Sequence, residues 1–205
     1  MKSLSICILT AALSVSLQAT TVFYNTTGAF TGGTPTSTSD SITFGNETDY
    51  ATITFTYDLS DSATSSGLAT NANFGVFSVA VTDPDDVEIS IPATDFTLAI
   101  NETTPGSNTS PLILTGLLSA GEVTASSSSV NVSFSPDSGT VTDTTVPGTA
   151  TYTLFTTPIA AETTGNSTLT GTLLYVDTAT PEPATLAMVG AGLLCLALIA
   201  RRKRT

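Results

Sequence analysis

Strict alternation of side chains between residues 51 and 59 is the feature that most constrains the fold of this chain. In the segment ATITFTYDL, apolar side chains occupy every second position, and threonine or aspartate fills the positions between them. A period of two places one set of side chains on each face of a β-strand, and β-branched threonine suits strands. The segment therefore predicts a half-buried strand with these inward side chains: Ala51, Ile53, Phe55, Tyr57 and Leu59.

Similar short segments recur through residues 20–180, separated by clusters of Gly, Pro, Asn, Asp and Ser. Many short, turn-separated strands are typical of antiparallel β-sandwiches. We therefore predict an all-β fold, an antiparallel β-sandwich of roughly ten short strands. The expected strands are residues 21–24, 41–44, 51–59, 74–81, 87–91, 95–100, 112–118, 130–134, 150–155 and 168–176.

Aromatic residues at these strand positions indicate where the core lies, because all nine Phe and all five Tyr fall within residues 20–180. In segment 74–81 the alternation slips near Val76 and Phe77, which predicts a β-bulge beside Gly75. The expected core phenylalanines are Phe23, Phe44, Phe55, Phe77, Phe96, Phe134 and Phe155.

The charge of this segment excludes several classes of function. Residues 20–180 contain 16 Asp or Glu and no Lys, Arg, His, Cys or Trp, so the formal charge is −16 and neither side-chain salt bridges nor disulfides can form. Nucleic-acid binding needs cations, Ser and Cys hydrolases normally use a His or Lys base, and His/Cys zinc sites need those ligands. A metal site here would have only oxygen ligands, which suits calcium.

The N-terminal residues 1–19, MKSLSICILTAALSVSLQA, have the organisation of a secretory signal peptide. Lys2 supplies the positive start, residues 4–15 form a short apolar core, and Ala19 is a small residue at a plausible cleavage point. We expect cleavage before Thr20 and export of the segment that follows.

The C-terminal residues predict a single membrane helix. Residues 184–200 contain no charge and, as a helix, would be about 25 Å long, which is close to the thickness of the hydrocarbon layer. The basic tail, residues 201–205, should remain in the cytoplasm and stop transfer, which leaves the preceding segment on the outer side of the inner membrane. The stop signal consists of Arg201, Arg202, Lys203 and Arg204.

A stiff tripeptide, Pro181, Glu182 and Pro183, lies directly before this apolar run. Each proline fixes its own φ angle and disfavours helix at the preceding residue, so the tripeptide should be extended. An extended segment at the membrane face suits recognition by an enzyme located in that membrane.

Together these features resemble the PEP-CTERM sorting signal of Gram-negative bacteria. Residues 180–205 contain its Pro-Glu-Pro, its short apolar helix and its basic cluster in the same order. The resemblance implies processing by an exosortase, a membrane-embedded enzyme similar to cysteine transpeptidases. It also implies transient anchoring in the inner membrane and then delivery to the cell surface or extracellular matrix, often in bacteria that make exopolysaccharide. The expected organisation is a signal peptide (1–19), a β-sandwich domain (20–179) and a sorting signal (180–205).

For the domain itself we expect a structural or adhesive protein that is not an enzyme, with exopolysaccharide as a candidate partner. One alternative is a carbohydrate-binding module, which would need an aromatic platform. A less favoured alternative is a glycosidase that uses two carboxylates. The only tyrosines available for a platform are Tyr24, Tyr50, Tyr57, Tyr152 and Tyr175.

The densest group of carboxylates is the segment DPDDVE, residues 83–88. Four acidic side chains in six residues repel one another, and a bound calcium ion would relieve this repulsion. The segment lacks the spacing of an EF-hand loop, and the alternative is a solvated turn between two strands. Calcium is thus the only cofactor we consider, and its candidate ligands are Asp83, Asp85, Asp86 and Glu88.

Overall fold

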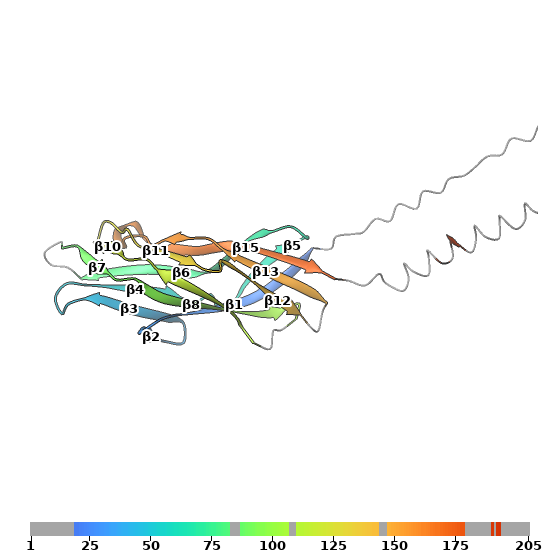
Figure 1. The fold of residues 1–205 in the computed structure, drawn as a ribbon, viewed down its shortest axis with the longest axis horizontal. Helices are drawn as coiled ribbons and strands as arrows, with labels where there is room; N and C mark the ends of the chain where they lie inside the picture. Colours follow the sequence, from blue (N-terminus) through green and yellow to red (C-terminus); the bar gives the residue numbers. More distant parts are fainter. Residues whose placement is uncertain are drawn as a thin grey trace, which may run out of the picture.

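The computed structural model describes residues 19–82, 87–106, 110–143 and 147–178, together with residues 190, 192 and 193. Within these ranges the chain forms fifteen β-strands and one short 3-10 helix, η1 (Glu162–Thr164). The prediction of an all-β fold is therefore confirmed, although the strands are more numerous than the ten or so expected. The strands build an elongated body, shown in Figure 1.

Two antiparallel sheets contain most of the strands, and a separate pair is formed by β7 (Ile89–Ile91) and β10 (Gly121–Val123). The six-stranded sheet has the order β14 (Thr157–Pro158), β11 (Asn131–Phe134), β9 (Leu112–Leu118), β8 (Thr94–Thr104), β1 (Thr20–Phe30) and β5 (Asp61–Ser65). The seven-stranded sheet has the order β12 (Ser138–Asp143), β13 (Gly148–Leu154), β15 (Ser167–Asp177), β6 (Thr70–Thr82), β4 (Tyr50–Thr56), β3 (Ser39–Gly45) and β2 (Thr34–Pro35).

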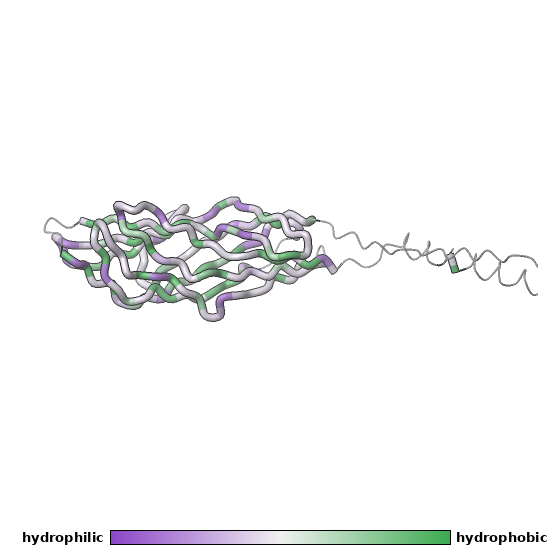
Figure 2. Tube along the Cα trace, turned by 90° about the horizontal axis from the view of Figure 1, so that it is seen from above, coloured by the Kyte–Doolittle hydropathy of each residue, from purple (hydrophilic) through white to green (hydrophobic). Residues whose placement is uncertain are grey.

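The core lies between the two sheets and is rich in aromatic rings. Phe96 of the six-stranded sheet has ring-centroid distances of 5.1 Å to Phe55 and 5.4 Å to Phe77, which both belong to the seven-stranded sheet. All three side chains are fully buried. Figure 2 shows hydrophobic positions distributed along the whole length of the body, interspersed with polar ones. This alternation is what two sheets need when each buries only one face.

The residues of β1 that face the core are not the ones we expected. Its inward positions include Val22, Tyr24 and Phe30, which are buried, so Phe23 points outward and is 45% exposed. Phe155 follows the last residue of β13 and is 47% exposed. The prediction that Phe23 and Phe155 belong to the core is therefore wrong.

The remaining core phenylalanines lie as expected or nearly so. The side chains of Phe55, Phe77, Phe96 and Phe134 are buried, and Phe44 is half-buried against the core. Phe30 and Phe74 are additional core residues that lie outside the expected set.

A β-bulge in β6 explains why Phe74 and Phe77 are both buried although they are three residues apart. Thr168 pairs with Val76 whereas Thr170 pairs with Asn73, so β6 contains an extra residue opposite β15. Gly75 has a φ angle of 130°, which L side chains rarely adopt. The predicted bulge beside Gly75 is confirmed, and it shifts the strand's alternation by one position.

Strand β4 is shorter than predicted, because the chain leaves it after Thr56 and crosses to the six-stranded sheet. The main-chain N–H of Thr26 donates to the carbonyl of Asp58 (2.6 Å), and the N–H of Asp58 donates to the Thr26 hydroxyl (3.0 Å). This crossover turns Leu59 outward, where it is 55% exposed, so the prediction that Leu59 faces inward is wrong. Tyr57 is half-buried and packs against the core.

The strands that the sequence pattern missed share one property. Each forms an edge of one of the two main sheets, except for β10, which pairs with β7. Edge strands are short and bury few side chains, so their sequences show little alternation. The missed strands are β2, β5, β10, β12 and β14.

The two predicted terminal segments lie mostly outside the described residues. This applies to the signal peptide, residues 1–19, of which only Ala19 is described, and to the expected helix 184–200, of which Gly190, Gly192 and Leu193 are described. Among the described residues, no helix has the length and apolar character needed to cross a membrane.

Candidate functional site

The last strand of the body ends very close to the predicted sorting motif. Strand β15 ends at Asp177, and the N–H of Thr178 donates to the carbonyl of Pro147 (3.0 Å). Pro181 follows Thr178 by three residues, so the chain between them can extend at most about 10 Å. The tripeptide 181–183 and the basic residues 201–204 lie outside the described residues. An enzyme that acts on the tripeptide would therefore work directly beside the folded body.

Both ends of the body lie at the same end of the molecule. Thr20 pairs with Ser65, and the hydroxyl of Ser65 accepts a hydrogen bond from the N–H of Tyr175 (3.1 Å). Figure 1 shows the start of β1 and the end of β15 side by side at this end. If both terminal segments are removed as predicted, the two new chain ends would lie near each other.

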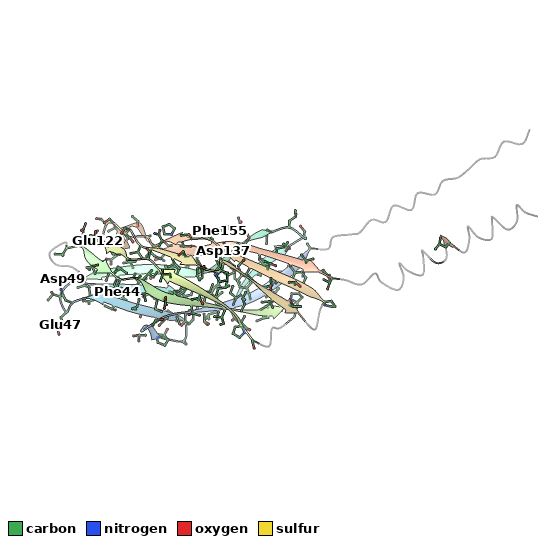
Figure 3. All side chains as sticks on the ribbon, in the orientation of Figure 1. Phe44, Glu47, Asp49, Glu122, Asp137 and Phe155 are labelled. Atoms are coloured by element: carbon green, nitrogen blue, oxygen red, sulfur yellow. The ribbon has the colours of Figure 1, made fainter. Side chains whose placement is uncertain are left out.

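The opposite end of the body carries acidic residues from a turn and from β10. Figure 3 shows Glu47, Asp49 and Glu122 there, far from the end of β15. The turn that contains Asp49 is closed by the Asn46 side-chain oxygen, which accepts hydrogen bonds from the N–H groups of Thr48 and Asp49 (2.8 Å each). These contacts are those of a tight polar turn.

The candidate calcium ligands are only partly described. Asp83, Asp85 and Asp86 lie outside the described residues, and Glu88 is exposed just before β7. In the part of the chain that the structure describes, no three acidic, His or Cys side chains are grouped closely enough to hold a metal ion. The calcium hypothesis therefore stays a prediction that only experiment can test.

Calcium binding by residues 83–88 predicts a higher melting temperature in millimolar calcium, because an ion that binds only the folded state stabilises it. The Asp85→Asn variant should lose this shift, whereas the control variant Asp95→Asn, which changes an exposed carboxylate of β8, should keep it. Calorimetry with and without chelator measures the effect. An unchanged melting temperature in both the unmodified protein and Asp85→Asn would remove calcium from consideration.

Asp40 is a buried carboxylate that sequence reasoning missed. Its side chain is 1% exposed, and its Oδ2 accepts a hydrogen bond from the N–H of Phe30 (2.6 Å). Gly33 leaves room for this carboxylate, since a Cβ at that position would collide with Asp40. Asp40 thus fastens the end of β1 to β3. The signal that could have revealed it is its inward phase, which it shares with Ile42 and Phe44.

A second buried carboxylate, Glu102, lies in β8 and is 1% exposed. The hydroxyl of Tyr152 donates to Glu102 Oε2 (3.1 Å), which joins the two sheets through a polar contact inside the core. Tyr152 also packs edge-on against Tyr24, with ring centroids 5.9 Å apart. Because no basic residue exists in the body, such hydrogen bonds take the place that ion pairs have in other cores.

The two buried carboxylates are too far apart to act as a glycosidase pair. Glu102 pairs with Tyr24 of β1, whereas Asp40 binds the N–H of Phe30 at the far end of the same strand. Six residues of β-strand separate these two positions by about 20 Å. The carboxyl groups of glycosidases lie at most about 9.5 Å apart.

Asp58 and Asp61 are neighbouring carboxyl groups, and their contacts are those of the crossover turn. Burial, and then the neighbouring Asp61, raise the pKa of Asp58 above its usual value. Asp58 Oδ1 accepts from the N–H of Ser60 (3.3 Å), and Asp61 Oδ1 accepts from the N–H of Ser62 (2.6 Å).

Most of the tyrosines are too deeply buried to form an aromatic binding platform. The side chains of Tyr24, Tyr152 and Tyr175 are at most 2% exposed. Only Tyr50 and Tyr57 reach the surface, and each does so in part. An aromatic platform of the kind that a carbohydrate-binding module needs cannot be built from the three buried rings.

The buried tyrosines predict that the fold weakens at alkaline pH. Burial raises the pKa of both Tyr24 and Tyr152 far above the usual value of 10, and the nearby carboxylates raise it further. Below pH 10 both hydroxyls are protonated in the folded and unfolded states. Above it only the unfolded chain ionises, so stability falls by up to about 1.4 kcal/mol per pH unit for each tyrosine.

The Tyr152→Phe variant tests this prediction. It removes one ionisable group, so its free energy of unfolding should fall less steeply between pH 10 and pH 11.5 than that of the unmodified protein. It also loses the hydrogen bond to Glu102 and should be less stable by about 1–3 kcal/mol at pH 8. Urea unfolding at several pH values measures both effects. Equal slopes for the two proteins would contradict the prediction.

Comparison with known proteins identifies only the C-terminal segment. No curated protein and no solved structure is similar enough to this chain to match it. A family model, described as the PEP-CTERM protein-sorting motif, matches residues 179–204, which is the segment that resembled this signal in the sequence. The chain therefore carries a PEP-CTERM protein-sorting motif directly after the last strand of an almost entirely β-structured body.

Proposed function

We propose that this protein is an exported structural or adhesive component of the cell surface or extracellular matrix, processed by an exosortase and without enzymatic activity of its own. The single observation that carries the proposal is the sorting motif at residues 179–204. That motif implies export, passage through the membrane and processing by an exosortase. The β-sandwich body would then be the part that persists outside the cell.

The composition and packing of the body support a role that depends on a stable fold rather than on catalysis. It contains no Lys, Arg, His or Cys, so the usual bases and nucleophiles of hydrolases, apart from Ser and Thr, are missing. Its two buried carboxylates, Asp40 and Glu102, make hydrogen bonds that join structural elements. Its aromatic residues are mostly in the core. These properties suit a stable domain that is displayed by the cell.

Cell fractionation combined with C-terminal mass spectrometry tests the proposal. In the native host, the body should be found in the surface or matrix fraction and should lack the residues that follow the Pro-Glu-Pro tripeptide. In a strain without exosortase, the intact C-terminus should remain in the membrane fraction. Recovery of the intact C-terminus from the matrix, or of the processed protein from the exosortase-deficient strain, would contradict the proposal. A strain that lacks this protein should also form a matrix with weaker cohesion.

A further inference from the structure

The outer face of the seven-stranded sheet carries many hydroxyl groups. Strand β4 presents Thr52, Thr54 and Thr56 at its outward positions, and β13 presents Thr149, Thr151 and Thr153. The outward positions of β3, β12 and the first half of β15 continue this pattern with further Ser and Thr residues. The array is interrupted by Leu174 and Val176 of β15 and by β6, whose outward positions hold Asn, Val and Ala besides Ser78 and Thr82. The inward positions of the same strands hold the core, so the hydroxyl-bearing side chains all lie on one face.

The register of the strands places these hydroxyls in rows. Thr54 lies opposite both Ser41 and Ser78, on either side of it, and Thr153 lies opposite Thr172. Neighbouring strands are about 4.8 Å apart, and successive outward residues of one strand are about 6.7 Å apart. The outward Ser and Thr side chains therefore form rows of groups that each donate and accept a hydrogen bond, interrupted by the apolar outward positions of β6 and β15. One cross-strand contact is seen directly, between the hydroxyls of Thr43 and Thr52 (2.9 Å).

The same face carries no carboxylate. Among the outward positions of the seven strands that the structure describes, none is Asp or Glu, although residues 20–180 contain 16 of them. The outer face of the six-stranded sheet is different in charge, because it presents the exposed carboxylate of Asp95. Exposed apolar side chains occur on both faces, such as Ile113 on this one and Val176 on the other. The uncharged hydroxyl array is thus a property of one sheet rather than of the whole surface.

We propose that this hydroxyl array, the outward Ser and Thr residues of the seven-stranded sheet, binds a neutral, hydroxyl-rich polymer, namely an uncharged polysaccharide. The proposal rests on the proposed function, since it assigns a ligand class to a protein displayed outside the cell. A neutral ligand avoids repulsion from the acidic body, and its hydroxyls can pair with donors and acceptors on the array. Each contact replaces one made by water and is weak, so binding depends on many contacts along an extended chain.

Other ligands fit this face less well. Anionic polymers are repelled by the formal charge of −16 on residues 20–180, and metal ions would need the carboxylates that this face lacks. Stable protein interfaces usually centre on Trp, Tyr or Arg, and the centre of the array has none of them. A lipid surface would require a larger apolar area.

Substitution of threonine by valine tests the array, because valine has nearly the same shape, suits β-strands and lacks the hydroxyl. The test variant combines Thr149→Val, Thr151→Val and Thr153→Val on β13. The matched control combines Thr27→Val, Thr97→Val and Thr115→Val, three outward positions of the six-stranded sheet. The full-length protein in detergent is assayed by affinity electrophoresis in gels that contain dextran, with alginate as the acidic comparison.

We expect dextran to retard the unmodified protein and the control variant, and the β13 variant to bind at least tenfold more weakly. Alginate should retard none of them. No retardation by dextran, equal loss in both variants, or stronger binding to alginate would overturn the proposal. So would a concentration-dependent dimer that only the β13 variant loses, because the face would then bind a second copy. If circular dichroism shows that the β13 variant is unfolded, Thr52→Val with Thr54→Val provides the same test on β4.

The result of the dextran-binding test can be distinguished from the result of the test of the proposed function. A processed protein in the matrix fraction that does not bind dextran would overturn the ligand assignment alone. Binding to dextran by a protein that is never released from the membrane would overturn the proposed function alone.

Discussion

Replacement of Phe96 by alanine should lower the free energy of unfolding by about 3–5 kcal/mol. Phe96 is fully buried at the centre of the core, and its ring lies 5.0 Å from Phe30, 5.1 Å from Phe55 and 5.4 Å from Phe77, measured between centroids. The substitution removes contacts with both sheets and leaves a cavity that they cannot close. Because the body contains no disulfide and no salt bridge, no covalent or ionic link offsets this loss.

Phe155→Ala is the matched control, because it makes the same chemical change at a side chain that is 47% exposed. Its effect should be below about 1 kcal/mol. Urea unfolding followed by tyrosine fluorescence measures both variants. A similar loss of stability in the two variants would mean that the aromatic cluster around Phe96 is not the centre of the core.

Alanine substitution of Pro181, Glu182 and Pro183 should abolish processing of the C-terminus. The family model places the sorting motif at residues 179–204. The two prolines are expected to keep its tripeptide extended. With alanine in its place, the apolar segment can continue as helix toward the body and no longer presents an extended strand. The expected result is that the protein is exported but keeps its C-terminal residues and stays in the membrane fraction.

Mass spectrometry of the C-terminus measures this effect in the native host. The control variant replaces Pro92 and Pro111 by alanine, two exposed prolines of the body, and should be processed normally. Release of the triple-alanine variant with the same C-terminus as the unmodified protein would show that the tripeptide does not direct processing.

Strands with two flanking neighbours were predictable, and those at the edges of the two main sheets were not. Strand β9 has the predicted bounds of 112–118 and lies between β8 and β11. Strand β12 was missed, because its sequence SGTVTD offers a single large apolar side chain, Val141, to the core. An edge strand is held mainly by main-chain hydrogen bonds to one neighbour. Because every residue type can make these bonds, they produce no recognisable pattern of side chains in the sequence.

The candidate site was predictable only where it depends on local sequence. The sorting motif is a contiguous pattern, and the family model confirms it at residues 179–204. Asp40 and Glu102 are buried through contacts with Phe30 and Tyr152, which are 10 and 50 residues away in the chain. The inward phase that Asp40 shares with Ile42 and Phe44 is a local signal, but the groups to which the two carboxylates bond come from distant parts of the chain.

The sequence alone determined that the body is all-β, that salt bridges and disulfides play no part in its stability, and that the chain carries a sorting motif. Each of these follows from composition or from patterns within a few residues. Only the tertiary structure decided which face of each strand is buried, as Phe23 and Phe155 show, and which outward faces combine into one uncharged hydroxyl array. The physical reason is that a period of two defines two faces of a strand, whereas the neighbours that bury one of them come from distant parts of the chain.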